Sequence, residues 1–227
     1  MRNITENTLT MSTSSIVKLT EPQIQPAGQL LARAFFDDPF GTHIFPDHVQ
    51  RQDGLTWYFT ALTRASYWFD AVYVTADEVT GVAVWIAPDQ TLTPQQIDEA
   101  GLNRTRTFFG TEAYERYHQI VDPLAVLHAR DVPLPHWYLT LIGVEPDQQG
   151  RGLGGALLAP ILAQAEAPGL ACYLETLTPQ NVKFYERHGF HVVVEGVLPD
   201  CHLPFWTMRR DPERGQERIT ENGGQSV

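Results

Sequence analysis

The sequence predicts an α/β domain, because its hydrophobic pattern switches repeatedly between the period of a strand and the period of a helix. The chain has 227 residues, of which 43% are hydrophobic and 19% charged, a composition typical of a globular protein with one substantial core. It contains no internal repeat and no clear linker. We therefore expect a single domain over residues 15–210, with the polar segments 1–14 and 211–227 as disordered tails.

The N-terminal half is expected to alternate strands with helices. A helix is predicted wherever apolar residues recur every three to four positions. The first helix should end at residues 37–41 (DDPFG), a run of helix-breaking residues. The segment 90–131 is expected to be a helical insertion. The predicted elements are a strand at 16–19, helices at 22–36 and 50–69, a hairpin of strands at 71–76 and 79–87, and helices at 94–109 and 111–127.

The C-terminal half continues this alternation. Pro133 and Pro135 stop the insertion and open a long strand. Pro179 occupies the first position of a helix, where its missing N–H costs little, and Gly189 follows as a C-terminal cap. Pro160 lies inside a predicted helix, where proline costs about 3 kcal/mol, so we expect a bend or an early break there. The predicted elements are strands at 136–144, 170–176, 190–197 and 203–209, and helices at 152–167 and 179–188.

The charge and the cysteines argue against several classes of protein. A formal net charge of −11 disfavours a nucleic-acid partner, since such proteins concentrate lysine and arginine. Cys172 and Cys201 lack metal-ligand spacing and predict neither a disulfide framework nor a zinc site. The polar N-terminus has no apolar signal core, and no apolar run approaches the ~20 residues that span a bilayer. We therefore expect a cytoplasmic protein with no metal, no membrane association and no nucleic-acid partner.

The strongest local signal is the glycine-rich segment 144–155 (VEPDQQGRGLGG), which lies between a predicted strand and a predicted helix. Gly150, Gly152, Gly154 and Gly155 have no Cβ, so the backbone can approach a ligand closely. A helix N-terminus also presents unpaired N–H groups and a partial positive charge. These features predict a site for a phosphate or pyrophosphate, with a charge-assisted contact from Arg151. We call the segment 144–155 the cradle.

The spacing of the cradle excludes two common nucleotide-binding motifs. A P-loop needs GxxxxGK[ST], and no Lys-Ser or Lys-Thr follows these glycines. A dinucleotide-binding fold needs GxGxxG after its first strand, whereas Gly150, Gly152 and Gly154 repeat at every second residue. Glu175 is near the distance expected for a ribose-binding carboxylate, but it lies inside a predicted strand.

A second signal lies at 181–190 (NVKFYERHGF). Asn181 and Tyr185 are four residues apart and therefore share one face of the predicted helix. The Tyr185 phenol could hydrogen-bond to the sulfur of a bound thioester and protonate the departing thiolate as a general acid. Taken alone, this tyrosine would more often be a half-buried core residue.

Three parts of the sequence carry a family resemblance: Gln149-x-x-Gly152-x-Gly154, Asn181, and residues 184–190 (FYERHGF). They resemble the GNAT superfamily of N-acetyltransferases. Residues 136–139 (HWYL) and 174–176 (LET) further resemble its puromycin N-acetyltransferase-like branch. The resemblance implies an α/β (α+β) fold with a central mixed, mostly antiparallel sheet of about seven strands flanked by helices. It also implies that the sheet splays between its fourth and fifth strands, where acetyl-CoA binds.

The same resemblance implies roles for individual residues. The backbone at 142–144 would pair with the pantetheine arm of acetyl-CoA like an added strand, and Asn181 would contact that arm. Tyr185 would be the general acid. The residues implied to bind acetyl-CoA are Ile142, Gly143, Val144, Gln149, Gly150, Arg151, Gly152, Leu153, Gly154, Gly155, Asn181 and Tyr185.

The general base has several candidates. A protonated alkyl amine, with a pKa near ~10, must lose a proton before it can attack a thioester. Glu175, His136 and Tyr138 could take that proton, directly or through water. We rank Glu175 first, because a carboxylate inside an apolar strand is costly unless it is used or paired. A purely structural partner for Glu175 is an equally open alternative.

We expect an acetyl-CoA-dependent N-acetyltransferase that acts on a primary amine of a small molecule by direct attack in a ternary complex, since no activated cysteine or serine is visible. Two alternatives stay open: acetylation of a protein N-terminus or lysine, and a CoA-binding sensor without catalysis. The acceptor, the acyl preference and the choice between monomer and homodimer are also open. The aromatic candidates for an acceptor pocket, beside the insertion 90–131, are Phe36, Phe40, Trp57, Tyr58, Tyr67 and Trp68.

Overall fold

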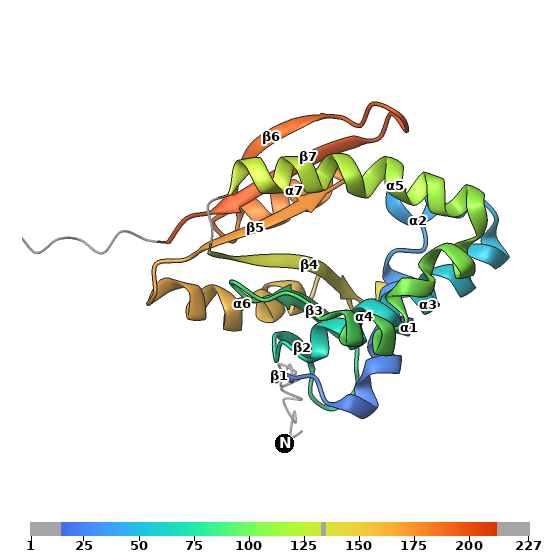
Figure 1. Ribbon diagram of the computed structural model, residues 1–227. Helices are drawn as coiled ribbons and strands as arrows, with labels where there is room; N and C mark the ends of the chain where they lie inside the picture. Colours follow the sequence, from blue (N-terminus) through green and yellow to red (C-terminus); the bar gives the residue numbers. More distant parts are fainter. Residues whose placement is uncertain (1–14, 133–134, 213–227) are drawn as a thin grey trace, which may run out of the picture.

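The computed structural model describes residues 15–132 and 135–212 (Figure 1). Within these residues, seven strands form one sheet in the order β1-β2-β3-β4-β5-β7-β6. Among these described strands only β4 and β5 run parallel, and the other neighbouring strands are antiparallel. The predicted mixed, mostly antiparallel sheet is thereby confirmed. The strands are β1 Ile16–Lys18, β2 Val72–Thr75, β3 Gly81–Ile86, β4 His136–Val144, β5 Ala171–Thr176, β6 His191–Val197 and β7 Pro204–Arg210.

Helices pack on both faces of the sheet, and side-chain alternation along the central strands divides the core between them. In β3, Val82 and Val84 face the core formed with α1, α3 and α5, whereas Ala83 and Trp85 face the core formed with α6. Burial on both faces explains why these strands read as continuous apolar runs. The helices are α1 Ile24–Ala34, α2 Pro39–Ile44, α3 His48–Tyr67, α4 Pro94–Ala100, α5 Thr105–Asp131, α6 Leu153–Glu166 and α7 Pro179–Glu186.

Two proline-containing segments differ from the prediction. Residues 37–41 were expected only to break a helix, but they begin α2, because the Asp38 carboxylate accepts a hydrogen bond from the Phe40 N–H at 2.9 Å and caps the helix. The early break expected at Pro160 is wrong, since α6 continues to Glu166. Ala156, whose carbonyl loses its helical partner to Pro160, is exposed, so water can hydrate that carbonyl.

The insertion 90–131 also has boundaries that differ from the prediction. The helix predicted over 94–109 ends at Gly101, whose φ of 87° is left-handed. The boundary predicted at residue 110 is confirmed as a kink, since Gly110 has non-helical backbone angles within α5. Beyond this kink the helix runs to Asp131, past the predicted end at 127. The predicted tails lie outside the described residues, apart from 211–212. No helix within 15–132 and 135–212 combines the length and apolar character needed to cross a bilayer.

Candidate active site

The site begins where β4 and β5 part. They form three parallel pairs, the last between Tyr138 and Tyr173. Just beyond, Thr140 is an extra residue in β4, because its neighbours Leu139 and Leu141 pair with consecutive residues of β3. Such a β-bulge bends its strand, and here β4 leaves β5 immediately beside it. This divergence is the splay that the family resemblance implied.

Two cavities occupy the opening. One is lined by the glycines and flanking residues of the cradle, and we call it the cradle cavity. The other contains the carboxyl groups of Asp38 and Glu175, and we call it the carboxylate cavity. Ile142, Asn181 and Tyr185 line both. The two cavities therefore meet at these three side chains.

The cradle presents its backbone to the cavity. Gly150 and Gly152 have φ angles of 75° and 84°, in the left-handed region that favours glycine. Gly152 is the N-cap of α6, and the first helical hydrogen bond runs from the Ala156 N–H to the Gly152 carbonyl at 3.1 Å. The N–H groups at the start of α6 therefore have no partner within the helix, as an anion site requires.

The remaining cradle glycines have a packing role that the sequence analysis missed. A Cβ at Gly154 would lie 3.0 Å from Phe184 Cζ, and a Cβ at Gly155 would lie 2.6 Å from His188 Nε2. These two glycines thus let α7 approach the start of α6. The residues predicted to bind the donor that do line the cradle cavity are Ile142, Gly143, Val144, Gln149, Gly150, Gly152, Leu153, Gly154, Gly155, Asn181 and Tyr185.

Arg151 is the exception among the predicted donor-binding residues. Its side chain is exposed and lies outside the lining of the cradle cavity. The lining instead includes Arg187 and His188 at the end of α7, for which the sequence analysis proposed no role. Positive charge near the cradle therefore comes from the helix that follows β5 rather than from the loop itself.

Tyr185 and Asn181 lie on one face of α7, as predicted. The Asn181 amide donates a hydrogen bond to Thr176 Oγ1 at 3.2 Å, which fixes its orientation at the end of β5. Tyr185 is 5% exposed. Burial, and then the charge of Asp38, raise the pKa of the Tyr185 phenol well above its ordinary value. The phenol is therefore protonated at neutral pH and able to donate.

Glu175 is a buried carboxyl group in the wall of the carboxylate cavity. Its side chain is 9% exposed, and the Tyr138 hydroxyl donates to Glu175 Oε2 at 2.8 Å. Burial raises the pKa of Glu175 to about 7, against a smaller lowering effect of the Tyr138 hydrogen bond. A carboxyl group that titrates near neutral pH is suited to act as a general base.

Two histidines lie behind Glu175. His128, near the end of α5, has its Nδ1 atom 3.8 Å from Glu175 Oε1 and its Nε2 atom 2.7 Å from His136 Nε2. Its ring stacks on Tyr173 at 4.6 Å between centroids. Burial, and then the charge of His136, lower the pKa of His128 to about 4, so its imidazole is neutral at pH 7. Neither histidine is among the residues that line the carboxylate cavity.

The buried Glu175 has a consequence for stability. Its pKa is about 7 in the folded chain against an ordinary value of 4.5, so folding favours the protonated form. The contribution to stability is present below pH 4.5 and is lost as the pH rises through about 7. We expect Glu175→Gln to increase the free energy of unfolding at about pH 8 by about 3 kcal/mol relative to the wild type.

Urea unfolding of the two proteins across a pH series measures this difference. The gain should shrink steadily toward acidic pH, because glutamine resembles the protonated carboxyl group. A difference that is independent of pH would show that the carboxylate is not destabilised by its surroundings.

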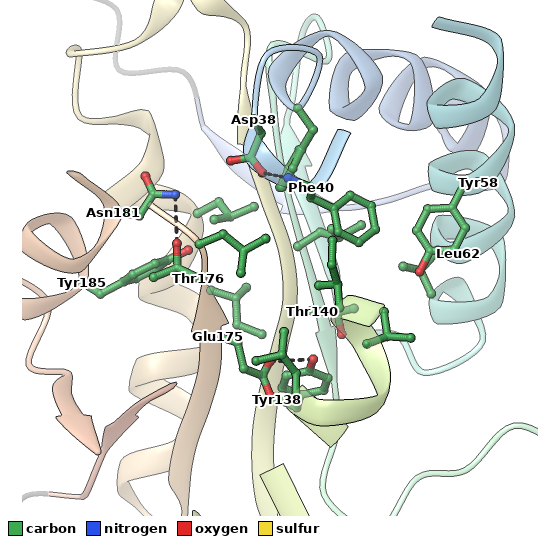
Figure 2. Close-up of a pocket in the computed structure, with 18 residues that line it drawn as sticks. Asp38, Phe40, Tyr58, Leu62, Tyr138, Thr140, Glu175, Thr176, Asn181 and Tyr185 are labelled. Atoms are coloured by element: carbon green, nitrogen blue, oxygen red, sulfur yellow. Dashed lines mark hydrogen bonds between the residues drawn. The ribbon is translucent and has the colours of Figure 1, made fainter. Parts of the chain in front are cut away.

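Asp38 is a site residue that the sequence analysis did not identify. Figure 2 shows Asp38 and Phe40 on one side of the opening and Asn181 and Tyr185 on the other. Burial raises the pKa of Asp38, while the hydrogen bond from the Phe40 N–H lowers it in part. An Asp-Pro pair at a helix start was the signal that could have placed this side chain at an N-cap.

The remaining wall of the carboxylate cavity is largely apolar. Of the six aromatic candidates, Phe40 and Tyr58 line it, whereas Phe36, Trp57, Tyr67 and Trp68 do not. Trp57 instead stacks on Phe108, at 4.3 Å between centroids. No lysine, arginine or histidine is among the described residues that line this cavity. The insertion contributes apolar side chains from α5, namely Ile120, Val121 and Leu124.

Comparison with known proteins gives the family. A model of the acetyltransferase (GNAT) family matches residues 33–190. An uncharacterised N-acetyltransferase of Schizosaccharomyces pombe is 28% identical over 200 residues, which cover 82% of this chain and 79% of that protein.

Solved structures agree in fold. The crystal structure of histone acetyltransferase HPA2 and related acetyltransferase from Corynebacterium glutamicum is 25% identical, with a TM-score of 0.66 and coverage of 89% of this chain and 98% of that one. Arylalkylamine N-acetyltransferase 2 from Aedes aegypti is 13% identical, with a TM-score of 0.58 and coverage of 86% and 97%, and so shares the fold.

A parted β4–β5 pair, a helix start with unpaired N–H groups beside a cavity and a buried tyrosine fit the site of an acyl-group transferase. Because the family model spans most of the sequence, the chain belongs to the GNAT family of acetyltransferases. It is an acetyl-CoA-dependent N-acetyltransferase, as predicted. Membership of the puromycin N-acetyltransferase-like branch stays a prediction.

Proposed function

We propose that this protein acetylates the primary amine of a small cationic molecule, with acetyl-CoA and the amine bound together. The observation that carries the proposal is that the cradle cavity and the carboxylate cavity meet at Ile142, Asn181 and Tyr185. A donor held in one cavity and an acceptor in the other would react at this junction. Holding both partners in place replaces a bimolecular encounter and supplies much of the rate.

The cradle cavity suits the donor. The unpaired N–H groups at the start of α6 would hold the pyrophosphate of acetyl-CoA, and the β4 backbone at 142–144 would run beside the pantetheine arm. β4 has no β5 partner along this stretch, so its edge is free to pair with an extended ligand. Asn181 would contact the same arm from α7.

The carboxylate cavity suits a cationic acceptor. Glu175 would take one proton from the ammonium group, which leaves the nitrogen free to attack the thioester carbonyl carbon. Tyr185 would then donate its proton to the sulfur as the carbon–sulfur bond breaks. The nitrogen gives up its second extra proton as the tetrahedral intermediate collapses, and that proton, passed through water, restores the Tyr185 phenol. The products are the N-acetyl amine and the free thiol, and the proton taken by Glu175 is the one that each turnover of a protonated amine releases to solvent.

The lining of the carboxylate cavity favours a small molecule over a protein substrate. Side chains of α2, α3 and α5 line the acceptor side of the opening, and those from α5 are apolar. Tyr138 belongs to the last β4–β5 pair, and Glu175, to which it donates a hydrogen bond, lies two residues beyond that pair on β5. We infer that the reactive amine belongs to a small molecule with a short apolar body rather than to a polypeptide.

The charge of the cavity gives a testable selectivity. We expect alkyl or arylalkyl amines to have a kcat/KM about tenfold or more above that of matched amines bearing a carboxylate, because Asp38 and Glu175 repel an anion and no cation in the described lining offsets them. Pairs of amines that differ only in a carboxylate, compared at fixed acetyl-CoA, measure this ratio. Equal rates within pairs would contradict the proposed acceptor site.

The cradle gives a second prediction. Gly152→Ala should raise the KM for acetyl-CoA about tenfold, since it strains a left-handed turn and adds a methyl group where the backbone faces the ligand. Gly169→Ala is the matched control: its φ is 70°, its Cβ would also meet open space, and it is outside the cradle cavity. Both variants should lose similar stability, but Gly169→Ala should keep the wild-type KM. A normal KM in Gly152→Ala would contradict the cradle assignment.

A thiol-release assay with acetyl-CoA and a panel of amines, peptides and N-terminal protein segments tests the function as a whole. Turnover with small amines supports the proposal. Turnover confined to peptides or proteins favours the protein acetyltransferase alternative. Tight CoA binding without turnover of any acceptor favours a CoA-binding sensor.

A further inference from the structure

Glu175 is connected to a second group of titratable side chains on its far side. Its Oε2 atom accepts from Tyr138, which lines the same cavity, while its Oε1 atom faces His128 Nδ1 at 3.8 Å. His128 continues to His136 at 2.7 Å between their Nε2 atoms. The carboxyl group thus separates the acceptor cavity from a histidine pair.

His128 is held in a defined orientation. Its ring lies nearly parallel to that of Tyr173, with an angle of 20° between the planes, and Nε2 is engaged by His136. These contacts direct Nδ1 toward Glu175. The His128 side chain is 22% exposed, against 9% for Glu175, and His136 is buried, so His128 is the member of this group that reaches solvent.

The position of His128 follows from the length of α5. Leu124 lines the carboxylate cavity, and His128 comes one helical turn later on the same face of the helix. The insertion that closes the acceptor cavity therefore also brings an imidazole behind Glu175.

We propose that His128 and His136 form a proton exit route that returns Glu175 to its carboxylate form while the cavity is occupied by product. This inference rests on the proposed function. The proton that Glu175 took from the amine passes from its carboxyl oxygen to His128 Nδ1, after a rotation of the carboxyl group closes the gap. The Nε2 proton of His128 moves to His136 Nε2, and the histidine pair then loses one proton to water.

A neutral imidazole suits this role, because one ring nitrogen accepts a proton while the other donates one. The groups that face His128 are Glu175 and His136, with Tyr138 and Tyr173 against its ring. The two tyrosines have raised pKa values and stay protonated, so they do not compete for the proton at neutral pH. His128 is a positioning and relay residue, since it acts on the substrate only through Glu175.

The experiment compares His128→Ala, His128→Phe and His118→Ala with the wild type at saturating acetyl-CoA and amine in a weakly buffering medium. His118→Ala is the matched control, because His118 lies on the same helix and pairs with the exposed Asp122. We expect His128→Ala to lower kcat about tenfold and added imidazole to restore most of it. His128→Phe, which keeps a ring against Tyr173, should lose a similar factor without rescue, because no space is left for imidazole.

The KM for acetyl-CoA should be unchanged in every variant, and His118→Ala should behave as the wild type. In a Glu175→Gln background, His128→Ala should cause no further loss, since no proton reaches it. The relay would be overturned if both His128 variants kept the wild-type kcat. It would also be overturned if the loss of kcat in His128→Ala were not restored by imidazole and persisted in the Glu175→Gln background. If wild-type protein turns over amines normally, such a result rejects the relay and leaves the proposed function intact.

Discussion

Tyr185→Phe is expected to lower kcat by about a hundredfold to a thousandfold and to leave the KM for acetyl-CoA nearly unchanged. Phenylalanine keeps the ring that packs against Phe184 and Phe190, so the junction between the two cavities keeps its shape. What is lost is the proton that the phenol gives to the departing thiolate. The raised pKa of Tyr185, caused first by burial and then by Asp38, keeps that proton in place until the carbon–sulfur bond breaks.

Steady-state kinetics with a fixed amine measure the loss of kcat. A second measurement uses an acyl donor that releases a thiol of lower pKa. An acyl donor whose thiol is more acidic needs less protonation, so its kcat should fall less in the variant. Tyr117→Phe is a suitable control: its hydroxyl bonds to that of Tyr58 at 3.2 Å, and it is outside both cavities. Full activity of Tyr185→Phe would remove this residue as the general acid.

Glu175→Gln is expected to lower kcat/KM by about a hundredfold at about pH 8, where the wild-type residue is a carboxylate. Burial raises the pKa of Glu175 to about 7, so the fraction of active base should rise with pH through that value and level off above it. Glutamine can still accept a hydrogen bond from Tyr138 but cannot take a proton. The kcat/KM of the wild type should therefore rise about tenfold per pH unit below 7 and become constant above it, whereas that of the variant should keep rising with the fraction of unprotonated amine.

The amine itself has a pKa near ~10, so its ionisation produces no change of slope near pH 7 in either protein. Glu195→Gln serves as a control, since Glu195 lies on the edge strand β6 and accepts a hydrogen bond from Trp206. A wild-type profile with no change of slope near pH 7 would exclude Glu175 as the base. In that case Asp38, the second carboxyl group of the cavity, would be the group to test next.

Activity and stability should change in opposite directions at this position. The same burial that tunes Glu175 to neutral pH destabilises the folded chain when the carboxylate is charged. A glutamine that lowers activity is therefore expected to stabilise the protein. The Tyr138 hydrogen bond gives Glu175 a structural partner as well, so the activity and stability measurements together decide between a chemical and a structural role.

The sequence was sufficient for the features that depend on neighbouring residues. Gly150 and Gly152 predicted a backbone that can approach a ligand closely, and both adopt left-handed φ angles that residues with a Cβ disfavour. The spacing of Asn181 and Tyr185 predicted one helix face, and both side chains reach the same junction. The alternating strand and helix periods predicted most elements of the mixed sheet. These features follow from local geometry, which a short stretch of sequence encodes.

Tertiary structure decided the features that join distant segments. The sequence predicted that Asp38 belongs to a segment that breaks a helix, yet the fold places it across the cavity from Tyr185. His128 lies just beyond the predicted end of a helix at residue 127, yet α5 extends far enough to bring it behind Glu175. Gly154 read as a ligand-facing glycine, yet its missing Cβ leaves space for Phe184.

The sequence by itself thus determined the donor side of this protein, because the cradle and the tyrosine helix are each continuous in the chain. Only the tertiary structure decided the acceptor side. That cavity is assembled from α2, α3, α5, β4 and β5, whose side chains are brought together by the core and by the bulge at Thr140. Packing between segments far apart in sequence has no local signature, so the residues that face the amine became visible only in the folded chain.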